Sequence, residues 1–306
     1  MTGTEVAWAR HPNGRWIVGD AGNQPSVVAV PPVLVRRRPD VTLDGGRVGM
    51  LDYRAASLRG IGHLETGKPR QDSYVVTVTR DDHWLVGCVA DGVSDGRMSH
   101  RAADLACEKI AAELIDGLAA GPDADLEALD WAAGVAGVNA AIHREFLHTA
   151  KVEEAALADV RALMSTTAVA FAVATQADAD GTHRAVIASL AGDSAALILD
   201  GDGWRPVTAV KGDGEEVASN AVRPLPREVE PEPVTLTLRP GDVLAVITDG
   251  IGDPMGSGGG VVGRFLAEQW AEPPDTIEFA NQVGFYRKTF MDDRTVIAVW
   301  VAPEPT

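Results

Sequence analysis

The sequence is poor in cysteine and contains no long hydrophobic run. Cys88 and Cys107 are the only two cysteines among 306 residues, and their isolated positions argue against a disulfide framework or a zinc site and favour a reducing compartment. No apolar run approaches the ~20 residues that a membrane-spanning helix needs, and the N-terminus shows no signal-peptide core. These absences predict a cytoplasmic protein that does not associate with a membrane.

Positive charge is also scarce. The chain has 27 lysines and arginines against 44 aspartates and glutamates, a formal net charge of −17. This excess of acid, which we expect on a solvated surface, disfavours nucleic acid and anionic membranes as partners. The strong basic run is Arg36-Arg37-Arg38, and such runs usually lie in solvated loops.

What is present predicts a sizeable globular core. Hydrophobic residues make up 45% of the chain, enough for one large domain or two ordinary ones. Prolines interrupt residues 1–50, which we interpret as an N-terminal extension of unknown role, with short edge strands near 26–30 and 33–35. We expect residues 51–302 to form the main domain.

Hydrophobic periodicity predicts the elements of that domain. Strands are expected at 73–79, 84–90, 166–174, 184–190, 195–199, 234–238, 243–248 and 295–301. Helices are expected at 99–117, 125–148, 155–163, 261–270 and 276–290. A polar excursion is expected at 211–230. Strands and helices do not alternate as in a doubly wound sheet, and their order fits two packed antiparallel sheets flanked by helices.

Four aspartates each lie at the start or the end of a predicted core strand. They occur in Arg70-Gln71-Asp72, Ala90-Asp91-Gly92, Thr248-Asp249-Gly250 and Asp292-Asp293-Arg294-Thr295. A carboxylate there is costly without a partner, and like charges ~4 Å apart repel by roughly 4 kcal/mol at an effective dielectric of about 20. Divalent cations relieve this repulsion, and hard oxygen ligands suit Mg2+ or Mn2+. Taken singly, Asp-Gly pairs are also common turns, as predicted for the hairpin loop at Asp200–Gly203.

The order and surroundings of these aspartates resemble a known family. The segments Ser57–Ser73 and Ala90–Gly96 look like the opening of a metal-dependent type 2C protein phosphatase of the bacterial subtype. Further motifs that resemble the family follow in its order: Met164-Ser165-Thr166-Thr167, Leu190-Ala191-Gly192-Asp193-Ser194, Ile247-Thr248-Asp249-Gly250-Ile251 and Asp292-Asp293-Arg294-Thr295-Val296. The resemblance spans about residues 51–302. It implies an α+β four-layer sandwich, in which two antiparallel β-sheets are flanked by pairs of α-helices.

The resemblance also implies an activity and its residues. Members of the family hydrolyse phosphoserine and phosphothreonine with two Mn2+ or Mg2+ ions that share a bridging water. By motif match, the catalytic residues are Asp72, Asp91, Asp249 and Asp292. The same four aspartates, with the carbonyl group of Gly92, are the implied metal ligands, and Asp72 acts through water. Thr295 sets the register that favours Asp292 over Asp293.

The chain departs from the family pattern at the phosphate-binding residue. Gly67 stands where the family's arginine is expected, and the segment Gly60–His63 resembles a Gly-x-x-His pattern seen in a bacterial subset. His63, Lys68 or Arg70 is therefore the candidate for contacting phosphate.

Two other positions leave parts of the site unassigned. Val93 replaces a histidine found in many members, so no side chain is assigned to protonate the leaving group. Ala162 lies near the position of a third-metal aspartate, so a third ion stays open. Asp193 is interpreted as a buried turn former, because aspartate readily bonds to nearby backbone.

The sequence therefore predicts a protein serine/threonine phosphatase that acts as a monomer on phosphorylated proteins, with a cognate kinase as a further candidate partner. Two alternatives remain open. One is a binding or regulatory module of the same fold with weak or absent catalysis, suggested by the missing arginine. The other is a hydrolase of a small phosphorylated metabolite. Retention of the acidic residues favours the enzyme, since buried charge without a role is costly.

Overall fold

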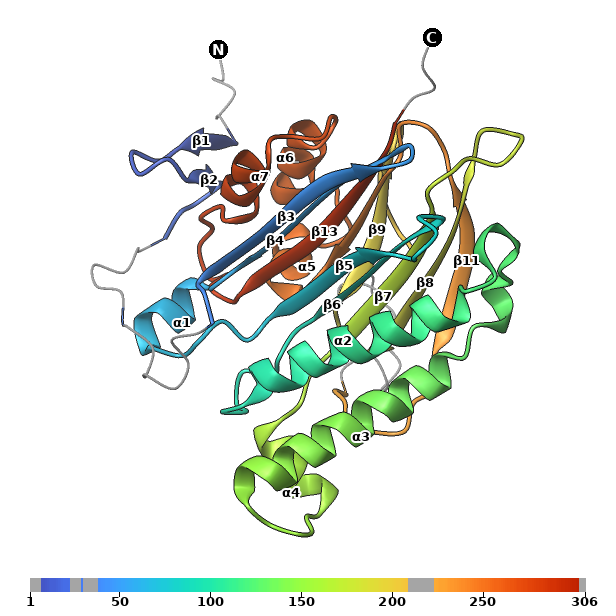
Figure 1. The fold of residues 1–306 in the computed structure, drawn as a ribbon. Helices are drawn as coiled ribbons and strands as arrows, with labels where there is room; N and C mark the ends of the chain where they lie inside the picture. Colours follow the sequence, from blue (N-terminus) through green and yellow to red (C-terminus); the bar gives the residue numbers. More distant parts are fainter. Residues whose placement is uncertain (1–6, 23–28, 30–37, 209–222, 303–306) are drawn as a thin grey trace.

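The computed structural model describes residues 7–22, 29, 38–208 and 223–302. Two antiparallel sheets are stacked face to face in the middle of the molecule (Figure 1). The first has the order β10 (Gly203–Pro206), β9 (Ala195–Asp200), β12 (Val243–Ile247), β13 (Arg294–Val301), β4 (Leu51–Leu58) and β3 (Val41–Val48). The second has the order β11 (Glu232–Leu238), β8 (His183–Ala191), β7 (Ala168–Ala174), β6 (Trp84–Ala90) and β5 (Ser73–Val78).

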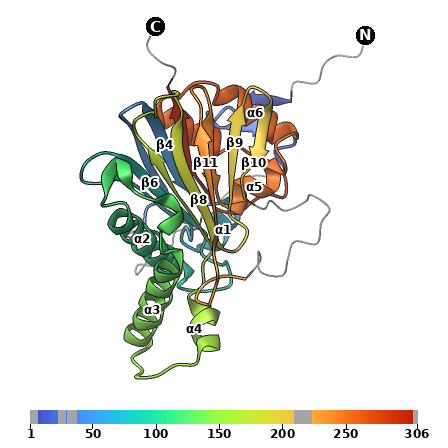
Figure 2. The ribbon, with the colours of Figure 1, turned by 90° about the vertical axis from the view of Figure 1, so that its right-hand side faces the viewer.

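Helices cover the outer face of each sheet. Figure 2 shows α2 (Ser99–Gly117) and α3 (Trp131–Ala150) on one side of the stacked sheets, and α5 (Asp249–Met255) and α6 (Val261–Gln269) on the other. The remaining elements are α1 (Ile61–Thr66), the 3-10 turns η2 (Gly121–Asp123) and η3 (Leu126–Ala128), α4 (Leu157–Leu163), α7 (Thr276–Val283) and the hairpin β1 (Trp8–Arg10) with β2 (Trp16–Val18). The predicted four-layer α+β fold is confirmed.

Alternation along the strands explains why the layers pack. Trp84, Val86 and Cys88 of β6 face the core beneath α2 and α3. The intervening Leu85 and Val89 face the core between the sheets. Because successive side chains of a strand point to opposite faces, a strand buried on both faces reads as a continuous apolar run, as β6 does.

Within the described residues, none of the helices has the length and apolar character needed to cross a bilayer. Most predicted elements are present with small shifts at their ends. The helix predicted to reach residue 290 instead ends at Val283. The chain after it turns back toward β2, where the Tyr286 backbone N–H donates to the Trp16 carbonyl at 2.6 Å. The buried guanidinium of Arg294 donates to the carbonyl groups of Phe285 and Phe290, which holds this return loop.

The described parts of the predicted N-terminal extension pack on the domain. Strand β3 is the edge strand beside β4, so the sheet begins at Val41, before the predicted boundary at residue 51. Trp8 and Trp16 of the β1–β2 hairpin contact Phe265 of α6 edge to face. The edge strands expected near 26–30 and 33–35 lie outside the described residues except for Ala29, and so does the first part of the excursion expected at 211–230.

Candidate active site

The sheet topology brings the predicted aspartates to one end of the sandwich. The start of β5 pairs with the end of β6, so Asp72, which precedes β5, lies beside Asp91, which follows β6. The end of β12 pairs with the start of β13 in the same way, which places Asp249 near Asp292. The two pairs belong to different sheets, and the stacking of the sheets brings them together.

A fifth aspartate joins this group. Carboxylate oxygens of Asp91, Asp193 and Asp249 all lie within 4.8 Å of one another. Asp193 precedes β9, whose first residue Ala195 pairs with Ile247 at the end of β12. The sequence pattern predicts a turn former at Asp193 and does not predict this placement. The signal was its position at the start of a core strand, the criterion that selected the other four.

The two threonines of the Met164–Thr167 motif hold Asp91 in place. The Asp91 backbone N–H donates to Thr167 Oγ1 at 3.0 Å, and its carbonyl accepts from Thr166 Oγ1 at 2.9 Å. Thr167 Oγ1 also shares a hydrogen bond of 2.7 Å with Ser194 Oγ. This network ties the loop that carries Asp193 to the strand end that carries Asp91.

Gly92 is enclosed by backbone. A Cβ atom at this position would lie 2.7 Å from the Ser99 carbonyl group and 2.8 Å from the Gln71 carbonyl oxygen. Any other residue would therefore push apart the start of α2 and the segment that leads to Asp72. The tight packing explains why glycine follows Asp91, and it keeps the backbone of Gly92 close to the carboxylates.

The carboxylates of the cluster destabilise one another's charged forms. The pKa of Asp72 is raised to about 8, chiefly by burial and further by the charges of Asp293 and Asp292, whereas the hydrogen bond from Thr248 opposes the rise. Burial also raises the pKa of Asp91 well above its ordinary value, with further contributions from Asp72 and Asp249. Several oxygen donors that need compensating positive charge are the ligand set that suits Mg2+ or Mn2+. The donor set therefore fits divalent cations.

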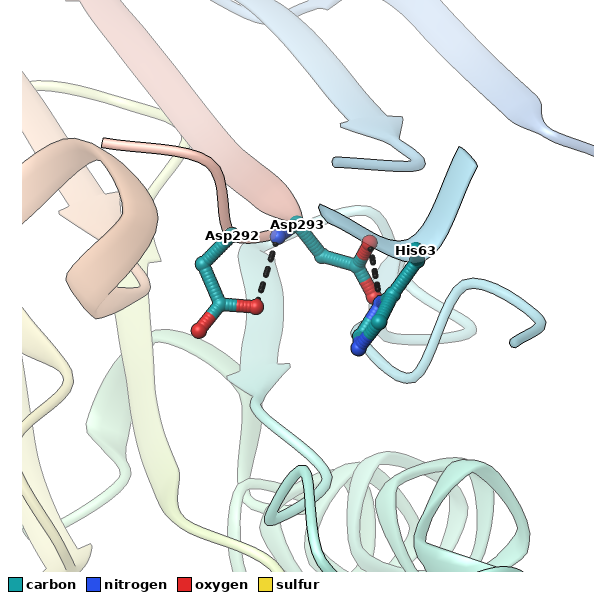
Figure 3. Close-up of side chains that lie close together, drawn as sticks. All are labelled: His63, Asp292 and Asp293. Atoms are coloured by element: carbon teal, nitrogen blue, oxygen red, sulfur yellow. Dashed lines mark hydrogen bonds and ion pairs between the residues drawn. The ribbon is translucent and has the colours of Figure 1, made fainter. Parts of the chain in front are cut away.

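Asp292 and Asp293 have different environments (Figure 3). Asp293 is 1% exposed, and its Oδ1 accepts from the Gly60 backbone N–H at 2.6 Å and from His63 Nδ1 at 2.9 Å. Its Oδ2 accepts from the Gln71 backbone N–H. Asp292 lines the neighbouring pocket, and its Oδ1 accepts from the Asp293 backbone N–H at 2.9 Å. Asp293 thus links three chain segments, whereas Asp292 faces the pocket.

The pocket has a volume of about 410 Å3 and opens beside the carboxylates. Asp249 and Asp292 line it together with His63 and Lys68. Lys68 Nζ donates to the Ser94 carbonyl at 2.9 Å. Burial lowers the pKa of His63, but the hydrogen bond and the charge of Asp293 outweigh this effect, so the pKa is raised overall. With Asp253, which also lines the pocket, two basic side chains and three carboxylates therefore border one cavity.

Arg70 is not among the residues that line the pocket. It is 5% exposed, and its Nη1 donates to Thr42 Oγ1 at 2.6 Å and to the Ser57 carbonyl at 2.8 Å. Burial and the charge of Arg38 lower the pKa of Arg70 to about 10. Its guanidinium is therefore engaged with β3 and β4 and does not face the pocket, contrary to the phosphate contact predicted for it.

A comparison with models of known protein families places the chain in one of them. The family model described as Protein phosphatase 2C matches residues 59–275, more than half of the chain. The chain belongs to the protein phosphatase 2C family. The predicted family and the predicted enzyme class, a protein phosphatase, are thereby confirmed. No curated protein matches the chain in a sequence search.

Solved structures share the protein phosphatase 2C fold at low sequence identity. A structure of the catalytic domain of the serine/threonine protein phosphatase PstP with two manganese ions has a TM-score of 0.52 and 21% identity, covering 83% of this chain and 99% of that one. RsbX in complex with magnesium has a TM-score of 0.50 and 15% identity, with 85% and 100% covered. PppA from Pseudomonas aeruginosa has a TM-score of 0.51 and 17% identity, with 83% and 98% covered.

Proposed function

We propose that this chain removes phosphate from phosphoserine and phosphothreonine in proteins, with two Mn2+ or Mg2+ ions held at the aspartate cluster. The proposed ligands are Asp72, Asp91, Asp249 and Asp292 with the carbonyl of Gly92. The observation that carries the proposal is that these carboxylates lie near enough to raise one another's pKa values, beside a pocket that is also lined by His63 and Lys68. The manganese ions of the PstP structure and the magnesium of the RsbX structure support the choice of cofactor.

The ions, when bound, would supply an activated water and would offset negative charge on the phosphoryl group. The chain's own residues provide the rest. Asp249 and Asp292 line the pocket, whereas Asp72 is buried and Asp91 half-buried beside them. We assign the ligand role to Asp292 because both carboxylate oxygens of Asp293 already accept hydrogen bonds. Asp193 is a further candidate ligand beside Asp91 and Asp249.

His63 and Lys68 are the proposed phosphate contacts. Asp293 holds the Nδ1 side of the His63 ring, which leaves Nε2 as the ring atom that can donate to a phosphate oxygen. Lys68 is anchored by Ser94 at the same wall. Because charge-assisted hydrogen bonds to phosphate are stronger than neutral ones, these two residues can take over the task of the arginine that Gly67 replaces.

The pocket also favours a phosphorylated side chain over a large rigid ligand. Phe290 and Met291 border it on the return loop after α7, and they offer apolar contact to residues that flank the phosphate. We therefore propose phosphorylated proteins as substrates. From the sequence, we further propose a cytoplasmic, monomeric enzyme that takes part in signalling and reverses the action of a cognate kinase. A small phosphorylated metabolite is the competing substrate class, and a binding module without catalysis is the competing function.

A hydrolysis assay tests the proposal. The substrates are p-nitrophenyl phosphate, phosphoserine and phosphothreonine peptides and a set of small sugar and nucleotide phosphates, each with Mn2+, Mg2+ or excess EDTA. We expect metal-dependent turnover of the phosphopeptides. Asp91→Asn is the inactive variant, and Asp202→Asn, in the exposed hairpin loop between β9 and β10, is the matched control. Turnover of metabolites alone would replace the substrate class, and metal binding without any turnover would favour the binding module.

A further inference from the structure

Arg38, in the segment that precedes β3, forms hydrogen bonds with the backbone around Asp72. Its Nε donates to the carbonyl of Arg70, and its Nη2 donates to the carbonyl of Asp72. One guanidinium therefore holds the backbone on both sides of Gln71. The basic run Arg36–Arg38 predicts a solvated loop at this position. The structure corrects that interpretation, because only 11% of the Arg38 side chain is exposed.

The third arm of the guanidinium is anchored on helix α2. Arg38 Nη1 donates to both carboxylate oxygens of Asp104 at 2.7 Å. Asp104 Oδ1 also accepts from Ser73 Oγ at 2.7 Å. Arg38 and Asp104 thus tie residues 70–73 to α2, a long helix that packs on the five-stranded sheet.

The same stretch of chain also contacts helix α1, which carries His63. The Ala29 backbone N–H donates to the Leu64 carbonyl at 2.7 Å, and the carbonyl of Ala29 accepts from Arg59 Nη2 at 3.2 Å. The segment before β3 therefore contacts the site at two described points, one behind Asp72 and one behind the His63 helix.

The chemistry of these contacts suits positioning. The guanidinium is a planar, permanently charged fork that fixes several acceptors at once. Asp72 is 1% exposed, and its Oδ2 is held by Thr248 Oγ1 at 2.8 Å. With the carboxylate fixed by Thr248 and the backbone fixed by Arg38, the Asp72 side chain is constrained at both ends.

We propose that Arg38 is a positioning residue that holds Asp72 in place for the metal site and so couples activity to the segment N-terminal to β3. The proposal rests on the function proposed above. Groups that orient a ligand typically contribute about 10- to 100-fold in metal affinity or activity. Loss of Arg38 should therefore weaken Mn2+ binding without removing the ligands themselves.

The test compares Arg38→Met with Arg54→Met. Arg54 is a matched control on β4, because its side chain is 15% exposed and its guanidinium donates to the carbonyls of Tyr53 and Pro274, each at 2.7 Å. Its ion-pair partner is Asp52 at 4.0 Å, which does not belong to the aspartate cluster of the site. Both variants lose a largely buried guanidinium and should lower the melting temperature of the metal-free protein. Only Arg38→Met should lower Mn2+ affinity, measured by calorimetry, by about tenfold or more.

Kinetics provide a second readout that a general loss of stability would not produce. In Arg38→Met the Mn2+ concentration for half-maximal activity should rise, and saturating Mn2+ should restore most of kcat with KM for p-nitrophenyl phosphate unchanged. Arg38→Lys, which keeps the charge but not the fork, should recover part of the Mn2+ affinity. Asp104→Asn, whose side chain is 46% exposed, should weaken Mn2+ binding several-fold and stands in if Arg38→Met does not fold.

The outcomes separate the two proposals. If the parent binds Mn2+ and turns over substrate while Arg38→Met and Asp104→Asn bind Mn2+ as the parent does, the positioning role is wrong and the phosphatase proposal stands. If the parent neither binds Mn2+ nor hydrolyses phosphate esters, the proposed function is wrong, and the proposed role of Arg38 is then wrong as well. Equal losses of Mn2+ affinity in Arg38→Met and Arg54→Met would also overturn the positioning role.

Discussion

His63 and Asp293 form a buried pair at the wall of the pocket, with 2.9 Å between His63 Nδ1 and Asp293 Oδ1. The pair joins the helix after β4 to the strand entry that carries Asp292. A histidine held by a carboxylate keeps its ring orientation and gains basicity, so His63 presents its other nitrogen to the pocket in a fixed direction.

Replacing His63 should affect substrate capture more than metal binding. His63→Ala should lower kcat/KM for a phosphopeptide by about 10- to 100-fold, since a hydrogen bond to a charged group contributes roughly 1.5–3 kcal/mol. The pKa of His63 is raised, so its contribution should be full at low pH and should disappear as the pH rises through that pKa. The measurement is kcat/KM against pH, with Mn2+ affinity in parallel. Identical profiles for parent and variant would show that His63 does not contact phosphate.

The partner of His63 provides a separate test. Asp293→Asn keeps the side-chain volume but removes the charge that raises the pKa of His63. The decline of kcat/KM with pH should therefore move to lower pH in this variant, and the same shift should be absent in the double variant that also carries His63→Ala. Because Asp293 also accepts from the backbone of Gly60 and Gln71, the melting temperature must be measured alongside.

Removal of divalent cations should abolish activity. The parent should hydrolyse p-nitrophenyl phosphate with Mn2+ or Mg2+, lose activity in excess EDTA and regain it when either metal is returned. The physical reason is that the carboxylates of the site repel an anionic phosphate unless bound cations compensate their charge. Undiminished turnover in EDTA-treated protein that contains no metal by elemental analysis would refute the metal assignment.

Neutralising one ligand should separate catalysis from stability. Asp91→Asn or Asp249→Asn should reduce kcat by more than the about 10- to 100-fold typical of residues that only support a ligand. The same change should raise the melting temperature of the metal-free protein, because it relieves repulsion within the cluster. Differential scanning calorimetry in EDTA measures this effect, with Asp202→Asn as the control. Parent-like turnover in Asp91→Asn would rule out its ligand role.

The metal-free protein should lose stability as the pH rises through the titration of Asp72. Its pKa is raised from 3.8 to about 8, so between these values the folded state binds more protons at this group than the unfolded state does. The free energy of unfolding then falls with increasing pH. Urea unfolding in EDTA at several pH values should show a steeper decline in the parent than in Asp72→Asn. Equal slopes would contradict the raised pKa.

Arg70 should act on stability and not on phosphate. Arg70→Met removes donors to Thr42 and Ser57 and should lower the melting temperature while leaving KM for p-nitrophenyl phosphate close to that of the parent. A rise in KM without a change in melting temperature would show that Arg70 contacts phosphate after all.

Much of the fold could be predicted from local pattern. The run Trp84–Ala90 and the helix Ser99–Gly117 have the same bounds in the sequence analysis and in the structure, because both have clear hydrophobic periodicity. Short elements with weak periodicity, such as α1 and α5, were missed, since six or seven residues provide too little pattern. The helix expected at 276–290 was overextended, because a tertiary contact with β2 draws residue 286 out of the helix.

The sequence by itself determined the family, most of the strands and helices from residue 73 onward and the aspartates at their ends, since each of these depends on residue type and spacing along the chain. Only the tertiary structure decided which side chains share a site. Asp193 joins Asp91 and Asp249 because β9 pairs with β12, Arg70 is directed into the sheet, and Arg38 reaches the backbone of Asp72 from the far side. These relationships join residues that are distant in sequence. A local pattern can mark a strand end, as it does at Asp193, but strand pairing and packing decide which other side chains lie beside it.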